Sequence, residues 1–323
     1  MTRALVIGRR RPGRPISKTV RETGRQLRDA GWKIETDVVD TKAQLRRRSA
    51  RAVKDGVDVV VAVGGDGAVS QVLQSVAGTD VALGVVPMGT GNLLAGNLEI
   101  PKGLESVAVL ADGGRRRIDL GRVRIGGKRR YFAIACGVGF DAEVMDATDR
   151  TEKQRLGKLA YFAGAIRRQG QVKDVAYEVT IDGEARPMDA AQILIANFGK
   201  MGAGVRSRLE VEPDDGLLDL IAISAAGPLG GLLAGLEALR QDEPGETPEG
   251  HVFRTRAGKV RVATASRRLV ELDGSVVGKT PIWVSVRPAA LTVIVPPGET
   301  SANPDDAPAT DGTPATDDAP GVA

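Results

Sequence analysis

The sequence predicts an α/β plus β fold class: an N-terminal doubly wound parallel-sheet domain and a C-terminal antiparallel β-sandwich domain. Two observations predict this division. Up to residue 98, short runs rich in valine and isoleucine alternate with segments whose apolar residues recur at helical spacing, as in a parallel sheet covered by helices. From residue 118 onward, strand-length apolar runs are separated mostly by glycine-bearing turns, which favours antiparallel pairing.

The N-terminal elements follow one another closely. Strands are expected at residues 4–7, 33–39, 57–63 and 81–86, and helices at residues 20–30, 43–54, 68–76 and 93–98. The third strand, VDVVVAV, is almost entirely apolar, as expected for a strand buried on both faces. We predict a domain over residues 1–118, joined by a returning strand at 288–296.

The second domain is predicted over residues 119–287. From residue 118 onward, strands are expected at residues 118–125, 128–140, 174–182, 190–198, 217–224, 259–265 and 267–274, followed by the returning strand with its apolar run at 291–296. An amphipathic helix at 156–168 is expected to cover the sheet, with contact to a membrane as the alternative. The uncharged segment after Leu220 is divided by Gly227-Pro228, so we predict a strand and a helix there rather than a membrane span. Residues 297–323 have the composition of a disordered acidic tail.

Charge is distributed unevenly along the chain. The formal net charge is +4, but six of the 41 acidic residues lie in a tail that has no Lys or Arg, so the rest carries +10. This basic surface suits nucleotide phosphates, an anionic membrane or nucleic acid. Only ten aromatic residues are present, which argues against a nucleic-acid partner. The single cysteine, Cys136, and the absence of a visible secretory signal predict a cytoplasmic protein.

Two glycine turns follow neighbouring strands of the predicted parallel sheet. Gly64-Gly65-Asp66-Gly67 lies between the third strand and a helix, where backbone N–H groups and the helix dipole can bind a phosphate. The segment 87–92, PMGTGN, occupies the same position after the next strand. Because ligands bind at the carboxyl ends of parallel strands, we expect the turns to converge. The Asp66 carboxylate has no evident structural role there.

Other common chemistries lack their sequence patterns. There is no GxxxxGK[ST], no GxGxxG that opens a helix after the first strand, and no GxSxG. His251, the only histidine, lies in a Gly250-His251-Val252 turn, which argues against His-based catalytic triads and His-rich metal sites.

A set of motifs in a fixed order remains. In chain order these motifs are GGDG at 64–67, GTGN at 89–92, IDLG at 118–121, DDGLLD at 214–219 and LDG at 272–274. In these motifs the chain resembles the diacylglycerol kinase catalytic-domain family of bacterial lipid kinases, which is related to ceramide and sphingosine kinases. The resemblance covers residues 3–296. It implies a two-domain kinase that uses ATP and Mg²⁺ to phosphorylate a diacylglycerol-like lipid hydroxyl in the cleft between the domains.

The resemblance also implies roles for individual residues. Those that would bind ATP are Gly64, Gly65, Asp66, Gly67, Gly89, Thr90, Gly91 and Asn92. Asp66 would also serve the magnesium that accompanies ATP, and Asp119 matches an acid of the metal and water network. Asp215 matches a magnesium position of structural character. Asp66, Asp119 and Asp273 are the predicted catalytic residues.

The sequence departs from the family pattern at several positions. They are Gly8-Arg9 for Asn-Pro, Ala68 for Thr, Gln71 for Glu, Leu93 for an acid, and Ser275 for the Glu that serves as general base. If residues 271–275 form one strand, Glu271 and Asp273 share a face with Ser275 and either could replace that base. Two alternatives therefore stay open. One is a weak or inactive family member that still binds nucleotide or lipid, and the other is a kinase for a soluble substrate such as NAD.

The resemblance predicts where the protein works. Its lipid substrate would lie in an anionic membrane surface, so we expect peripheral association with the inner face of the membrane. The oligomeric state is left open by the sequence, with a homodimer as one option.

Overall fold

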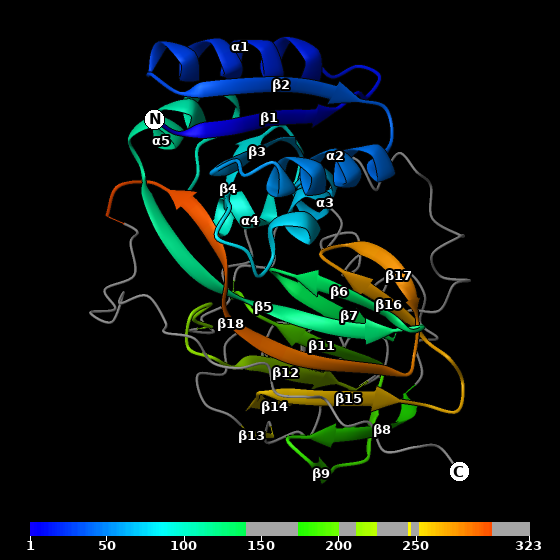
Figure 1. Ribbon diagram of the computed structural model, residues 1–323. Helices are drawn as coiled ribbons and strands as arrows, with labels where there is room; N and C mark the ends of the chain where they lie inside the picture. The colour runs from blue at the N-terminus through cyan, green and yellow to red at the C-terminus, as the bar shows by residue number, and fades with distance from the viewer. Residues whose placement is uncertain (140–173, 200–210, 225–244, 247–251, 299–323) are drawn as a thin grey trace.

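The computed structural model describes residues 1–139, 174–199, 211–224, 245–246 and 252–298. Figure 1 shows a helix-bearing α/β region above a region of antiparallel strands, with β5 (Gly114–Ile125) and β18 (Ile282–Val295) running between them. The predicted helix at 156–168, the helical half of the segment after Leu220 and the tail from residue 299 lie outside the described residues.

The α/β region has the predicted alternation of strands and helices. Its strands are β1 (Arg3–Arg9), β2 (Lys33–Val39), β3 (Val59–Gly64) and β4 (Ala82–Pro87). Its helices are α1 (Ile16–Asp29), α2 (Lys42–Lys54), α3 (Asp66–Val76), α4 (Leu93–Asn97) and α5 (Ser106–Asp112), with a 3-10 turn η1 (Gly103–Glu105). The strands pair in parallel in the order β4-β3-β1-β2.

Helices cover both faces of this parallel sheet because successive strand residues point to opposite sides. Leu5 and Ile7 of β1 pack in one core with α2 and α3, whereas Ala4 and Val6 pack in another with α1 and α5. The valines of β3 are all fully buried. The doubly wound prediction is confirmed. Helix α5 was not predicted, because its short apolar run SVAVLAD shows no helical period.

The antiparallel region contains two facing sheets. The strands are β6 (Lys128–Phe132), β7 (Ala135–Val138), β8 (Val175–Ile181), β9 (Glu184–Ala185), β10 (Met188–Ala190), β11 (Gln192–Ala196), β12 (Leu218–Ile223), β13 (Gly245–Glu246), β14 (Val252–Ala257), β15 (Lys259–Ala263), β16 (Leu269–Leu272) and β17 (Ser275–Lys279), together with β5 and β18. Seven strands form one sheet in the order β13-β14-β12-β11-β7-β16-β17, and the order β10-β8-β15-β18 belongs to the other.

The two sheets enclose a common core, which confirms the predicted sandwich. Val179, Val262 and Val284 from one sheet pack in one cluster with Ile195 and Leu220 from the other. Cys136 is also fully buried in this core, where burial raises the pKa of its thiol, as expected for a structural cysteine.

The segment 128–140 was predicted as one strand, and this is wrong. The structure divides it into β6 and β7, which belong to different sheets. The chain passes from one sheet to the other at Ala133 and Ile134. Backbone N–H groups at this crossing leave the strand ladder and require other acceptors.

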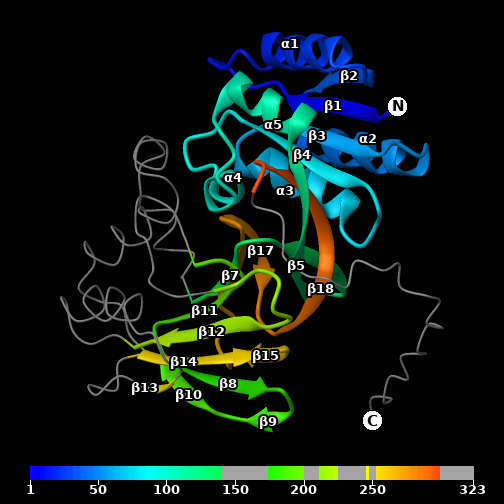
Figure 2. The same cartoon turned by 90° about the vertical axis from the view of Figure 1, so that its left-hand side faces the viewer.

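Strand β18 connects the α/β region with the sandwich. Residues 282–285 pair with β15, most of the strand pairs with β5, and Val293 pairs in parallel with Leu83 of β4. An irregularity in the β5 ladder lies between Arg287 and Leu291, where Ala289 has a φ of 49°. Figure 2 shows β5 and β18 passing together from one region into the other. One sheet of 11 strands therefore spans both regions.

Candidate functional site

The two predicted glycine turns lie against each other. β3 and β4 are parallel neighbours, so their carboxyl ends meet at one edge of the sheet, where the Met88 N–H donates to the Gly64 carbonyl at 2.8 Å. A Cβ added at Gly65 would lie 2.8 Å from the Cα of Gly89. This contact is too close for any side chain, so the packing of the two turns requires glycine.

The Asp66 carboxylate joins the two turns. Its Oδ1 accepts the Leu93 N–H at 2.5 Å, and its Oδ2 accepts the Asn92 N–H at 3.1 Å. These N–H groups precede the first complete turn of α4 and have no acceptor within that helix. The expectation that this carboxylate has no structural role was therefore wrong.

Asn92 closes the second turn on itself. Its φ is 49°, its Oδ1 accepts the Gly89 N–H at 2.8 Å, and its Nδ2 donates to the Gly89 carbonyl at 3.0 Å. The side chain is buried, whereas Thr90 and Gly91 are exposed. Of the predicted nucleotide residues in this turn, Thr90 and Gly91 are thus the ones that face outward, and Asn92 shapes the backbone.

Gln74 fixes helix α3 to the sandwich. Its Nε2 donates to the Tyr131 carbonyl at 2.7 Å, and its Oε1 accepts the Tyr131 N–H at 3.0 Å. The amide side chain thereby forms the two hydrogen bonds with the Tyr131 backbone that a neighbouring strand would otherwise form. Sequence reasoning missed this residue, because its partner is 57 positions away and a helical glutamine carries no signal of such a contact.

Asp119 lies where β5, β18 and the segment before β12 meet. The side chain is 2% exposed, its Oδ1 accepts the Ala289 N–H at 2.7 Å, and its Oδ2 accepts the Gly216 N–H at 2.7 Å. Burial raises the pKa of this carboxyl. Both oxygens bind backbone groups, which gives Asp119 a structural role at the irregularity in β18. Its role in a metal and water network stays a prediction.

The residues around Asp215 do not fit a divalent cation. Its Oδ1 accepts the Leu217 N–H at 2.9 Å, and its Oδ2 pairs with the Arg256 guanidinium. The neighbouring Asp214 pairs with Arg116 at 3.0 Å. No group of three or more acidic, His or Cys side chains that could hold a metal occurs in the described part of the chain, so backbone carbonyls and water would have to supply most of the ligands of a Mg²⁺ ion here.

Asp273 lies in a tight turn rather than on a strand. β16 and β17 form a hairpin whose two-residue loop is Asp273-Gly274, with φ values of 45° and 71°. Asp-Gly is a favoured pair for such a turn, in which both residues have positive φ. The expectation that Glu271, Asp273 and Ser275 share one strand face was therefore wrong, because Ser275 begins the next strand.

The Asp273 carboxylate accepts the N–H groups freed where the chain crosses between sheets. Ala133 donates to Oδ2 at 3.0 Å, and Ile134 and Ala135 donate to Oδ1 at 2.9 and 3.1 Å. The pKa of Asp273 is raised to about 6, chiefly by burial, with a smaller contribution from the negative charge of Asp66, while the three hydrogen bonds act in the opposite direction. Asp66 and Asp273 are thus close enough to interact electrostatically.

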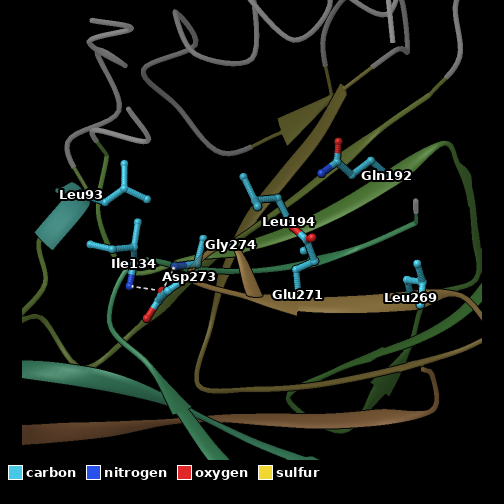
Figure 3. A pocket seen from close by; sticks show the side chains of 10 residues that line it. Leu93, Ile134, Gln192, Leu194, Leu269, Glu271, Asp273 and Gly274 are labelled. Carbon is cyan, nitrogen blue, oxygen red and sulfur yellow. Dashed lines mark hydrogen bonds between the residues drawn. The ribbon is translucent and has the colours of Figure 1, made fainter. Parts of the chain in front are cut away.

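A pocket extends from the Asp273 turn. Figure 3 shows the side chains of Leu93, Leu194 and Glu271 around it. The complete lining is Leu93, Ile134, Ala135, Gly137, Gln192, Leu194, Leu269, Glu271, Asp273 and Gly274. The wall is mainly apolar and carries two carboxylates. Leu93 is also the residue whose N–H binds Asp66, so the pocket borders the second glycine turn directly.

Comparisons with known proteins agree with this arrangement. The family model of the diacylglycerol kinase catalytic domain matches residues 3–123, and that of the YegS C-terminal NAD kinase beta sandwich-like domain matches residues 135–295. A diacylglycerol kinase from Mycobacterium tuberculosis strain H37Rv is 32% identical over 257 residues, which cover 78% of this chain and 81% of the relative. The chain belongs to the diacylglycerol kinase family. The predicted resemblance is thereby confirmed.

Further members of this family match most of the chain. A diacylglycerol kinase from Bacillus subtilis strain 168 is 26% identical over 286 residues, which cover 87% of this chain and 92% of the relative. The fold is similar to that of a candidate diacylglycerol kinase from Bacillus anthracis strain Sterne, with a TM-score of 0.77, 21% identity and coverage of 91% and 95% of the two chains. None of the described helices combines the length and apolarity needed to cross a membrane.

Proposed function

We propose that this kinase-family protein transfers the γ-phosphate of ATP to the hydroxyl of a diacylglycerol-like lipid at the membrane surface. The observation that carries the proposal is the position of Leu93 between the glycine turns and the pocket. Its backbone N–H belongs to the paired glycine turns, and its side chain lines the pocket that contains Asp273. A phosphate donor on the turns and an acceptor in the pocket would therefore be adjacent. The names of the relatives support lipid as the acceptor class.

The donor would bind at the start of α3. The first N–H groups of this helix have no acceptor within it and point toward the turn, where the helix dipole favours a phosphate. Gly65, Gly67 and Thr90 would contact the nucleotide. Mg²⁺ carried by ATP neutralises charge on the phosphates, which phosphoryl transfer requires. Asp66 would orient the turns around the nucleotide through its bonds to Asn92 and Leu93.

The acceptor hydroxyl would enter the apolar pocket. Its oxygen attacks the γ-phosphorus, its proton passes to the Asp273 carboxylate, and ADP leaves. Three backbone N–H groups fix the orientation of this carboxylate, and its raised pKa makes it a better base than an ordinary aspartate. Glu271 is a second carboxylate of the same pocket. In this mechanism Asp273 takes over the role that a glutamate at position 275 would have.

The pKa of Asp273 predicts a pH dependence. The carboxylate accepts a proton only when it is ionised, so kcat/KM should be constant above about pH 7, reach half of that value near pH 6 and fall about tenfold per pH unit well below the pKa of about 6. An aspartate with an ordinary pKa would keep its activity to about pH 4. The measurement is a kcat/KM profile from pH 4.5 to 8, with ATP affinity measured at each pH. A constant rate down to pH 5 would exclude Asp273 as the base.

Replacing Gly67 by alanine should separate nucleotide binding from folding. A Cβ at Gly67 would meet only the end of Lys42, at 3.7 Å, and alanine is the better helix former by up to about 1 kcal/mol. Stability should stay equal or rise, while ATP affinity falls at least about tenfold because the methyl group keeps the phosphates from the backbone. Calorimetry with ATP and thermal unfolding measure the two effects.

Gly96→Ala is the matched control for this variant. Gly96 is also helical, and no atom lies within 4 Å of its added Cβ. This variant should keep wild-type ATP affinity. If Gly67→Ala binds ATP as tightly as Gly96→Ala does, the nucleotide does not bind at this turn.

A transfer assay tests the whole proposal. Purified protein would be incubated with radiolabelled ATP, Mg²⁺ and vesicles that contain diacylglycerol, ceramide or a sphingoid base, with NAD as the soluble acceptor. We expect label in a diacylglycerol-like lipid. Label in no acceptor, with ATP binding intact, would identify a member that binds without transferring. Label in NAD alone would identify a kinase for a soluble substrate.

We also infer a peripheral membrane location on the cytoplasmic side. The net charge of +10 outside the acidic tail favours an anionic lipid surface, where a lipid substrate would be found. Binding to vesicles with and without anionic lipid tests this location, and binding that is independent of anionic lipid would contradict it.

A further inference from the structure

We propose that Arg256 replaces a divalent cation at Asp215, so that the segment of residues 211–217 is positioned by protein groups and folds without a metal. The family resemblance places a magnesium at Asp215, and a guanidinium binds there instead. Arg256 supplies the positive charge that a carboxylate at this position needs.

The ligand set leaves no room for the ion. Both Asp215 oxygens are in use, one by the Leu217 N–H and the other by Arg256. Asp119 is a buried acid that accepts the Gly216 N–H next to Asp215, and its other oxygen accepts the Ala289 N–H. A magnesium ion needs near-octahedral oxygen coordination and loses its water reluctantly. At Asp215 it would have to displace the guanidinium from Oδ2, and backbone carbonyls and water would have to supply its other ligands.

Arg256 is placed for this role by strand β14. Residues 254 and 256 of one strand point to the same face, and both reach aspartates of the segment that ends in β12. Arg254 donates to Asp219 Oδ1 from Nε at 2.8 Å and from Nη2 at 2.6 Å, and both side chains are buried. Arg256, two residues further along β14, likewise pairs with Asp215. The strand thus provides two arginines for two aspartates.

Two further contacts position the same segment. Arg116 of β5 pairs with Asp214 at 3.0 Å, and the Asp119 N–H donates to the Pro213 carbonyl at 2.6 Å. The segment is therefore attached to β5 and to β14 by groups of the chain itself. A metal would add no connection that these contacts lack.

The test measures thermal unfolding of the full chain without nucleotide, so it does not depend on kinase activity. After dialysis against EDTA, the wild-type melting temperature should be the same with and without 5 mM Mg²⁺, and metal analysis should find no stoichiometric ion. Arg256→Met should make the melting temperature sensitive to Mg²⁺, because it frees the Asp215 carboxylate. A rise of about 2 °C is expected at about tenfold above the dissociation constant.

Two variants control for the loss of an arginine. Arg256→Lys keeps a positive charge beside Asp215 and should remain insensitive to Mg²⁺. Arg261→Met removes an arginine of similar side-chain exposure, 37% against 39%, that pairs with Glu178 in another part of the sandwich, and it should also remain insensitive. A wild-type melting temperature that falls in EDTA would overturn the proposal. An Arg256→Met variant whose melting temperature does not change with Mg²⁺ would also overturn it. If Arg256→Met does not fold, the melting temperatures of the wild type and of Arg256→Lys with and without Mg²⁺ still test the proposal.

Discussion

Replacing Asp273 by asparagine should lower the turnover of the purified protein by about 10² to 10⁴, the usual effect of removing a positioned base. The turn itself tolerates the change, because asparagine adopts the positive φ of position 273 readily. The amide oxygen can accept the Ile134 and Ala135 N–H groups, but the amide nitrogen then faces the Ala133 N–H. One hydrogen bond is lost, at about 1–3 kcal/mol.

Glu271→Gln is the control for this variant, since Glu271 lines the same pocket two residues before Asp273. Turnover is measured with radiolabelled ATP at saturating lipid, at a temperature where thermal unfolding shows each variant to be folded. We expect Glu271→Gln to keep turnover within about tenfold of wild type. Full turnover in Asp273→Asn together with loss in Glu271→Gln would assign the base to Glu271 instead.

Replacing Asp119 by alanine should lower the free energy of unfolding by about 2–4 kcal/mol. The carboxylate is the acceptor for the Gly216 and Ala289 N–H groups, and its loss leaves both without that partner. Ala289 has a positive φ at the irregularity in β18, a conformation that needs support from its surroundings. Urea unfolding followed by circular dichroism measures the change.

Asp119→Asn distinguishes this structural role from a catalytic one. Asparagine keeps one acceptor oxygen, so it should restore about half of the lost stability and most of the turnover of the folded protein. An Asn variant with wild-type stability and no turnover would instead support the predicted place of Asp119 in a metal and water network.

Local sequence patterns predicted most of the α/β region, because strands and helices alternate there and most of the strands are rich in valine and isoleucine. Strand β2 matches its predicted bounds, and α2 begins one residue earlier than predicted. The capping box of Thr41 and Gln44 explains that start. In the sandwich, the strand at 128–140 was wrong because an apolar run contains no sign that the chain crosses between sheets at Ala133.

The candidate site was predictable in its glycine turns and less so in its carboxylates. GGDG and GTGN give the turn positions from sequence alone, and parallel pairing then brings the turns together. The partners of Asp273 are about 140 positions away, and those of Asp119 are 97 and 170 positions away. Such long-range pairs leave no periodicity in a single sequence. The Asp-Gly pair at 273–274 did carry a hairpin signal that the strand interpretation overlooked.

The parallel pairing of β18 with β4 has a consequence for how the protein is made. Leu83 pairs with Val293, so one edge of the N-terminal sheet stays open until about 210 further residues have left the ribosome. An open strand edge can pair with other chains. The two halves of the molecule therefore cannot mature one after the other as independent units. A chain that ends before β18 would lose the strand that pairs with β4, and β5 and β15 would lose their pairing with β18. We expect such a chain to aggregate rather than to form a working nucleotide-binding domain.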